Sequence, residues 1–175
     1  FALYVENATR WSEQFRTVAG VREDFYREIV KSNVDENSGK ATGNRASPKL
    51  SLIFGPWAKT EYYFNIGNGF HSNDARGTTI SVNPRDTAAI ATREKPLVLS
   101  RGLEVGARTE FIAGLQSSFS VYRLDFTSEL LFQGDAGTTA DTGRPSRRVG
   151  FEFSNYYKPY RWLTVDADIA FAKAR

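Results

Sequence analysis

The stretch that decides the fold is Glu61 to Gly77, which reads EYYFNIGNGFHSNDARG. In its first half, Tyr62, Phe64 and Ile66 alternate with polar residues and glycines. A period of two predicts a β-strand with one apolar face and one polar face. The glycines fall on the polar face, where a missing side chain leaves room for a close neighbour. From His71 onward the sequence is expected to form a long polar loop.

Seven further segments show the same alternation, and helical spacing fits each of them less well. They cover residues 1–11, 15–29, 48–55, 99–112, 115–132, 148–157 and 163–171. In the sixth strand, Leu124 and Phe126 are out of phase with Phe119 and Val121, which predicts a β-bulge near residues 122–123. The chain is therefore expected to be all-β, with eight strands, no helix and no internal domain boundary.

Composition excludes several classes of protein. The net charge is only +3, with acidic residues interspersed among the basic ones, so the sequence has no basic stripe for nucleic acid. It has no cysteine, which excludes disulfides and thiolate metal sites. No apolar run reaches the roughly 18 residues of a spanning helix. The mean hydropathy of −0.43 taken alone favours a soluble protein.

The connections between strands point the other way. They are short at 12–14, 56–60, 113–114 and 158–161, and long at 30–47, 72–97 and 133–146. Short turns at one end and long loops at the other are typical of an antiparallel, up-and-down transmembrane β-barrel. The strands are also long enough to cross a bilayer at a tilt.

Aromatic residues gather beside the short turns. The three tryptophans, Trp11, Trp57 and Trp162, lie there, and Tyr62 is close to one of these turns. Such residues form a girdle at a membrane interface, where a ring is half apolar and half hydrated. The alternative is a soluble β-sandwich binding module, which also has alternating strands. The charges and glycines of the polar face favour a water-filled barrel interior over a sandwich exterior.

Several stretches carry a resemblance to a known family. They include SPKLSLIFGPW, EYYFNIGNGFHSNDARGT, LSRGLEVGART, RPSRRVGFEFSNYYKP and WLTVDADIAFAKAR. Together they resemble the C-terminal β-barrel of TonB-dependent outer-membrane receptors, over nearly the whole chain. The resemblance implies a 22-stranded barrel in the bacterial outer membrane, plugged by an N-terminal domain. It also implies energy-coupled import of a scarce nutrient, such as a ferric siderophore or cobalamin.

On this resemblance we expect residues 1–175 to be one partial barrel domain, without the plug domain, the TonB box and the terminal strands. The implied partners are outer-membrane lipid, the protein's own plug, the TonB complex through an N-terminal region, and a small molecule or metal chelate. A passive porin or autotransporter-type barrel is the alternative that needs no TonB. Neither alternative requires a cofactor.

Two sets of residues are candidates for function. The first is a ligand-binding cluster in the loop that follows the opening strand, made of His71, Asn73, Asp74 and Arg76; the alternative is a loop that caps its own turn. One histidine is too few for a histidine-rich metal site, and neighbouring Ser, His and Asp residues in one loop have the wrong geometry for a catalytic triad. No enzyme activity is expected. The Gly-Asp-Ala-Gly turn at 134–137 suggests calcium but lacks the ligand density of a dedicated loop.

The second set is a polar wall that would face the lumen. Its members are Arg22, Asp24, Glu61, Glu104, Arg108, Arg148, Glu152, Asp166 and Asp168. These side chains are expected either to line a path or grip a plug, or to pair across strands and keep a hydrated wall rigid. The apolar residues between them, such as Val105, Phe151 and Ile169, are expected to face lipid.

Overall fold

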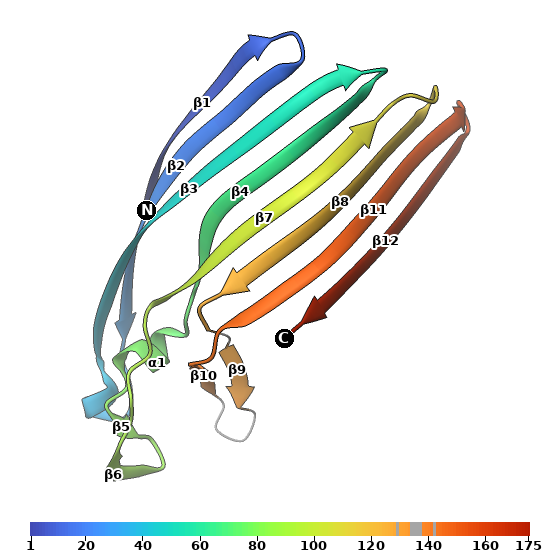
Figure 1. Ribbon diagram of the computed structural model, residues 1–175. Coiled ribbons are helices and arrows are strands. Elements are labelled where there is room, and N and C mark those ends of the chain that lie inside the picture. Colours follow the sequence, from blue (N-terminus) through green and yellow to red (C-terminus); the bar gives the residue numbers. More distant parts are fainter. Residues whose placement is uncertain (129, 134–137, 142) are drawn as a thin grey trace.

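The chain forms one curved antiparallel sheet of eight strands (Figure 1). The structure is a computed structural model that describes residues 1–128, 130–133, 138–141 and 143–175. The sheet strands are β1 (Ala2–Ser12), β2 (Phe15–Val30), β3 (Gly39–Trp57), β4 (Thr60–Ser72), β7 (Leu97–Thr109), β8 (Leu115–Phe126), β11 (Ser146–Tyr160) and β12 (Leu163–Ala174). They pair in the order in which they occur in the chain, which confirms the up-and-down topology.

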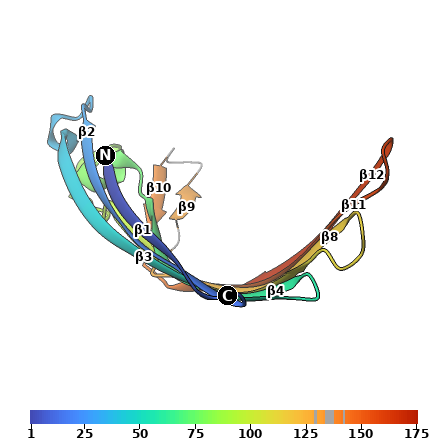
Figure 2. The ribbon, with the colours of Figure 1, turned by 90° about the horizontal axis from the view of Figure 1, so that it is seen from above.

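The sheet is a single open layer. Seen from above, it follows an arc whose first and last strands do not meet (Figure 2). Among the described residues the only buried hydrophobic side chain is that of Val98. A β-sandwich needs two packed sheets with an apolar core between them. The soluble sandwich is therefore excluded, and the arc is a section of a barrel wall.

All four short turns lie at one end of the sheet and the long connections lie at the other, as predicted (Figure 1). The sequence prediction was wrong about where β3 begins. Residues 39–47 are not part of a loop: β3 pairs with β2 up to Val30 opposite Gly39. The local Gly and Asn content predicts a loop, but the continuous ladder with β2 outweighs that preference.

Strands β3 and β4 separate towards the long-loop end. Their pairing stops at Lys49 opposite Gly67, although β3 continues along β2 and β4 continues along β7. The ladder ends beside Pro48, which has no N–H to donate. Leu97 approaches Gly43 of β3 at this opening.

The 73–96 connection is partly ordered, contrary to the prediction of a plain loop. It contains the short helix α1 (Ala75–Thr79) and the two-stranded sheet of β5 (Val82–Asn83) and β6 (Asp86–Ile90). A 3-10 turn at Asp35–Asn37 and the hairpin of β9 (Leu130–Gln133) and β10 (Thr138–Asp141) complete this end. Helix α1 and the β9–β10 hairpin lie inside the hollow of the arc (Figure 2). No helix in the part of the chain that the structure describes is long and apolar enough to cross a membrane.

Buried Asn37 joins two of these connections. Its side-chain Oδ1 accepts hydrogen bonds from the backbone N–H groups of Ser81 (2.8 Å) and Val82 (3.0 Å), and its Nδ2 donates to the carbonyl of Val82 (3.0 Å). From α1, the Thr78 hydroxyl donates to Glu28 Oε2 on β2 (2.7 Å). The β2–β3 connection and the 73–96 connection therefore pack as one polar unit.

The predicted β-bulge in β8 is absent. The register with β7 is continuous from Ser100 opposite Phe126 to Thr109 opposite Ser117, and the register with β11 is continuous as well. Leu124 therefore shares a face with the polar side of the sheet, and Arg123 shares a face with Val121. The apolar residues of β8 therefore change sides near the long-loop end without an inserted residue. There the concave face carries Leu124 and the convex face carries Arg123.

Candidate functional site

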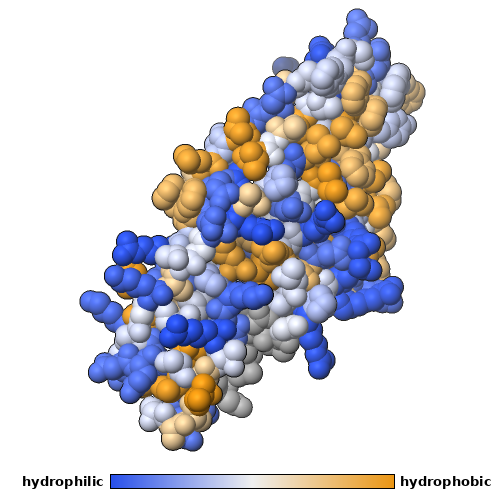
Figure 3. All heavy atoms as spheres, turned by 60° about the vertical axis from the view of Figure 1, so that its left-hand side comes forward, coloured by the Kyte–Doolittle hydropathy of each residue, from blue (hydrophilic) through white to orange (hydrophobic). Residues whose placement is uncertain are grey.

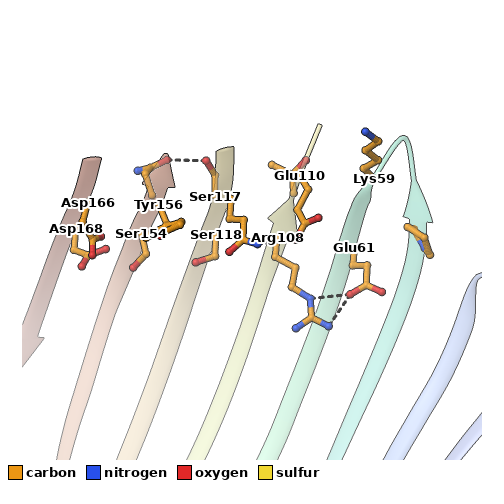
Figure 4. Close-up of a pocket in the computed structure, with 14 residues that line it drawn as sticks. Lys59, Glu61, Arg108, Glu110, Ser117, Ser118, Ser154, Tyr156, Asp166 and Asp168 are labelled. Carbon is orange, nitrogen blue, oxygen red and sulfur yellow. Dashed lines mark hydrogen bonds and ion pairs between the residues drawn. The ribbon is translucent and has the colours of Figure 1, made fainter. Parts of the chain in front are cut away.

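The polar side of the sheet is its concave side, and an ion network crosses it. Glu61 on β4 binds Arg16 on β2 (Nη1 to Oε1, 2.8 Å) and Arg108 on β7 (Nη2 to Oε2, 2.6 Å). Figure 4 shows the bonds between Arg108 and Glu61. Arg16 reaches Glu61 across the intervening strand β3, because side chains converge on the inner side of a curved sheet. The Glu61 side chain is only 16% exposed, because the two arginines flank it.

A second network surrounds Glu104 on β7. It accepts hydrogen bonds from Asn65 Nδ2 (3.0 Å) and from the Tyr63 hydroxyl (3.3 Å) on β4. The Tyr63 ring lies against Gly106, where any Cβ would collide with it. The glycines of the concave face thus make room for tyrosine rings, as the alternation predicts.

Other predicted wall residues pair more locally. Arg22 binds Asp24 two residues along β2, with Nη2 2.8 Å from Oδ1, and Asp24 is buried. The Arg148 guanidinium lies over the Phe126 ring, 5.1 Å from its centroid. The structure therefore brings together the wall residues of β4 and β7, and leaves Arg22 and Asp24 as a separate pair.

The last two strands of the concave face carry acids of a different kind. Glu152 on β11 and Asp166 and Asp168 on β12 have no hydrogen bond or ion pair with any described residue. Asp166 and Asp168 line a hollow of about 770 Å³ at the short-turn end, together with Glu61 and Arg108 (Figure 4). Glu152 lies between two described strands, whereas Asp166 and Asp168 lie on β12, the edge strand of the sheet, which adjoins only β11.

The proposed ligand cluster does not converge on one point. His71 lies within β4, opposite Val98 of β7, and its ring centroid is 6.3 Å from that of Phe126. Asn73 is buried and donates from Nδ2 to the carbonyl of Lys95 (2.6 Å). His71 Nε2 and Asn73 Oδ1 are buried without a partner among the described residues.

Asp74 and Arg76 form a pair of their own. The Asp74 carboxylate caps α1 by accepting the backbone N–H of Arg76 (2.9 Å), and it also accepts from the Arg76 guanidinium Nε (3.1 Å). The hydrogen bond to Asp74, and then its charge, raise the pKa of Arg76 above its ordinary value. This is the self-capped turn of the alternative prediction.

Sequence reasoning missed three buried polar atoms at the long-loop end. Arg45 Nε, Ser47 Oγ and Ser128 Oγ also lack partners among the described residues. Arg45 and Ser47 lie in the stretch that was expected to be a loop, so no strand pattern indicated them. No cluster of three potential metal-ligating side chains occurs in the described ranges. The 134–137 turn lies outside them.

The convex side of the sheet is apolar over its middle. Exposed side chains there include Phe119 (45%), Val105 (52%) and Ile169 (61%). Trp11 is the penultimate residue of β1 and Trp57 is the last residue of β3, and Trp162 lies in the turn before β12. The Tyr62 ring lies tilted against that of Trp57, with centroids 6.2 Å apart. In Figure 3 apolar side chains gather over the middle and upper part of the molecule, and hydrophilic ones predominate towards the long-loop end.

A single curved antiparallel layer with an apolar outside, a charged inside and asymmetric connections defines a section of a large membrane β-barrel. A sequence model of the family described as "TonB dependent receptor-like, beta-barrel" matches residues 1–174. The chain belongs to this family, whose members are outer-membrane receptors of Gram-negative bacteria and not enzymes. No curated protein sequence matches the chain.

Solved structures show the same fold. The chain is similar to the FrpB iron transporter from Neisseria meningitidis (F3-3 variant; 14% identity, TM-score 0.70), covering 99% of this chain and 25% of that one. It is similar to the copper transporter OprC (18% identity, TM-score 0.73; 99% and 28% covered). It is also similar to the ferric-catecholate import receptor Fiu from E. coli K12 (17% identity, TM-score 0.69; 99% and 27% covered). The chain thus spans about a quarter of the length of these structures.

Proposed function

We propose that this chain is part of the wall of an outer-membrane receptor that imports a scarce nutrient, such as a ferric siderophore or cobalamin, by energy-coupled transport. Family membership supports the proposal, because it implies a plug domain in the lumen and coupling to TonB. The titles of similar structures name iron, copper and a ferric catecholate as cargo. Their low identity leaves the cargo of this chain to experiment.

The observation that carries the proposal is that the carboxylates of the concave face are paired on some strands and unpaired on others. On β2, β4 and β7 the wall satisfies its own charges, with Glu61 held between two arginines. On β11 and β12 the carboxylates of Glu152, Asp166 and Asp168 have no partner among the described residues. A carboxylate that is partly withdrawn from water is stabilised by hydrogen-bond donors from a neighbour. Glu152 lies between β8 and β12, and a plug domain with basic or N–H groups would supply donors to it. Asp166 and Asp168 lie on the edge strand β12, where a neighbouring strand of the barrel is an equally direct source of donors.

The long-loop end is the proposed entry for the ligand. His71, Asn73, Asp74 and Arg76 lie at this end, but only the first two have buried polar atoms without partners. We therefore propose unequal roles. His71 and Asn73 hold hydrogen-bonding capacity for a ligand or for the plug, whereas Asp74 and Arg76 chiefly fix the start of α1.

Uptake by the full-length receptor tests the proposal. Cells carrying the receptor are given a labelled ferric siderophore or cobalamin, with and without collapse of the proton-motive force. Energy-dependent uptake that saturates at low concentration is expected. Uptake that persists without the proton-motive force would instead identify a passive porin.

Three single variants test which side chains of the 71–76 segment contribute to uptake. His71→Ala is expected to weaken uptake more than Arg76→Ala, and Arg85→Ala in the same connection serves as the control. Folded receptor in the membrane is quantified for each variant. Wild-type uptake by all three would show that these side chains serve only the architecture of the loop.

A further inference from the structure

The convex face carries a row of arginines where its apolar band ends. Arg101 on β7 lies opposite Asp125 on β8, and Asp125 lies opposite Arg147 on β11. Arg123 lies one step closer to the band, opposite Leu103 and Val149. Because the register has no bulge, all four side chains share the face of Val121 and not the concave face.

The arginines of this row are oriented by an aspartate and remain exposed to solvent. Asp125 accepts hydrogen bonds from Arg123 Nε (2.7 Å, to Oδ2) and from Arg147 Nε (2.7 Å, to Oδ1). The side chains of Arg123 and Arg147 remain 46% and 52% exposed. Arg101 is exposed and makes no hydrogen bond or ion pair with a described residue. One carboxylate thus orients two guanidinium groups and leaves the row with excess positive charge.

The position of the arginine row along the strands indicates which part of the membrane it contacts. On β7 the outward residues run from polar Thr109 through Ala107, Val105 and Leu103 to Arg101. The span from Thr109 to Arg101 is about 27 Å along the strand. At the usual tilt of about 40° this is about 20 Å across the membrane, close to the roughly 25 Å apolar band of such barrels. The arginines therefore lie where lipid hydrocarbon gives way to headgroups.

We propose that Arg101, Arg123 and Arg147 form a binding site for the phosphate of membrane lipid headgroups on the outer surface of the barrel. Guanidinium groups match phosphate oxygens with paired N–H donors, and Asp125 holds two of them at fixed orientation. Asn68 on β4 lies opposite Arg101, so it shares the convex face and adds a polar side chain next to the row. The site rests on the membrane placement of the proposed function.

The experiment is lipid binding to the purified full-length receptor by native mass spectrometry. The probes are phosphatidic acid, diacylglycerol as the lipid without phosphate, and inorganic phosphate alone. The wild type is expected to retain phosphatidic acid in preference to both other probes. Removal of one arginine is expected to weaken this binding about fivefold. Equal retention of diacylglycerol, or tighter binding of free phosphate, would overturn the proposal.

Variants locate the site. Arg101→Gln removes a side chain that makes no hydrogen bond or ion pair with a described residue, so the other side chains of the row keep their contacts. The triple variant Arg123→Gln/Asp125→Asn/Arg147→Gln removes the paired charges together and leaves no orphan carboxylate. Arg101→Gln is expected to weaken the binding of phosphatidic acid about fivefold, and the triple variant is expected to weaken it further.

The matched control is Arg22→Gln/Asp24→Asn/Arg148→Gln, which removes the same net charge from the concave face and leaves no orphan carboxylate. Loss of phosphatidic acid by the control as much as by the triple variant would contradict the proposal. A receptor that does not insert into membranes at all would contradict the proposed function, whereas an inserted receptor with no phosphate preference would contradict only this site.

Discussion

The two faces of the same strands differ in how their side chains are satisfied. On the convex face of β7, Val105 is 52% exposed and contacts no core. On the concave face, the next residue, Glu104, accepts two hydrogen bonds from β4. A sheet in water on both sides would gain nothing by exposing the valine. The difference shows that the faces contact two solvents: hydrocarbon outside, and water or a polar domain inside.

The largest effect on stability is expected from a charge in the apolar band of the convex face. Val105→Arg in the full-length receptor is expected to lower the free energy of unfolding by about 2–4 kcal/mol, because a guanidinium at the middle of the bilayer loses its hydration. Denaturant unfolding in lipid vesicles measures this.

Val165→Arg is the matched control. Val165 pairs with Tyr157 near the short turn, outside the middle of the band, so the expected cost is about 0–1 kcal/mol. Equal costs at both positions would mean that the convex face has no hydrophobic middle.

The inner face is tested by removing the carboxylate that bridges two arginines. Glu61→Gln leaves Arg16 and Arg108 facing each other without their shared partner. The expected loss of stability is about 1–2 kcal/mol, since a partly buried charged hydrogen bond is lost and water screens the remainder. The unfolding midpoint, compared with that of Glu152→Gln, measures the effect. A larger cost for Glu152→Gln would reverse the assignment of paired and unpaired carboxylates.

The smallest expected effect on stability comes from the two acids on β12. Asp166→Asn/Asp168→Asn is expected to change barrel stability by less than about 0.5 kcal/mol, because neither carboxylate has a partner on β11, the described neighbour of β12. Its effect should appear in the plug, which loses two acceptors. Limited proteolysis of the plug in the full-length receptor checks this. A destabilised barrel with an unchanged plug would show that these acids serve the wall.

Much of the fold was readable from alternation. The two faces of β4 could be predicted, because Tyr62, Phe64 and Ile66 have to share one side of the strand. The loop asymmetry predicted that the long connections share one end, but the sequence predicted neither α1 nor the β9–β10 hairpin within them. The start of β3 could not be predicted, since residues 39–47 have the composition of a loop and are ordered only by β2. The bulge in β8 was predicted wrongly because the apolar residues change sides where the strand leaves the apolar band. In the sequence this looks the same as an inserted residue.

The site was less readable than the fold. Charges at alternate positions predicted one polar face of the sheet. The sequence could not distinguish Glu61 from Glu152, because they differ only in whether neighbouring strands place arginines beside them. Asp74 and Arg76 looked like ligand groups, yet a carboxylate before a helix start binds its own turn. Arg101 and Arg147 became visible only when the continuous register placed them on the convex face.

The central claim is that odd-numbered residues of β7 face lipid and even-numbered ones face the lumen. Nitroxide labels placed one at a time at positions 103 to 108 of the full-length receptor in vesicles test it directly. Collision with oxygen, which concentrates in the bilayer, is compared with collision with a water-soluble nickel chelate. The account predicts that oxygen accessibility alternates with a period of two, with maxima at Leu103, Val105 and Ala107. Accessibility without that alternation, or with maxima at Glu104 and Arg108, would contradict it.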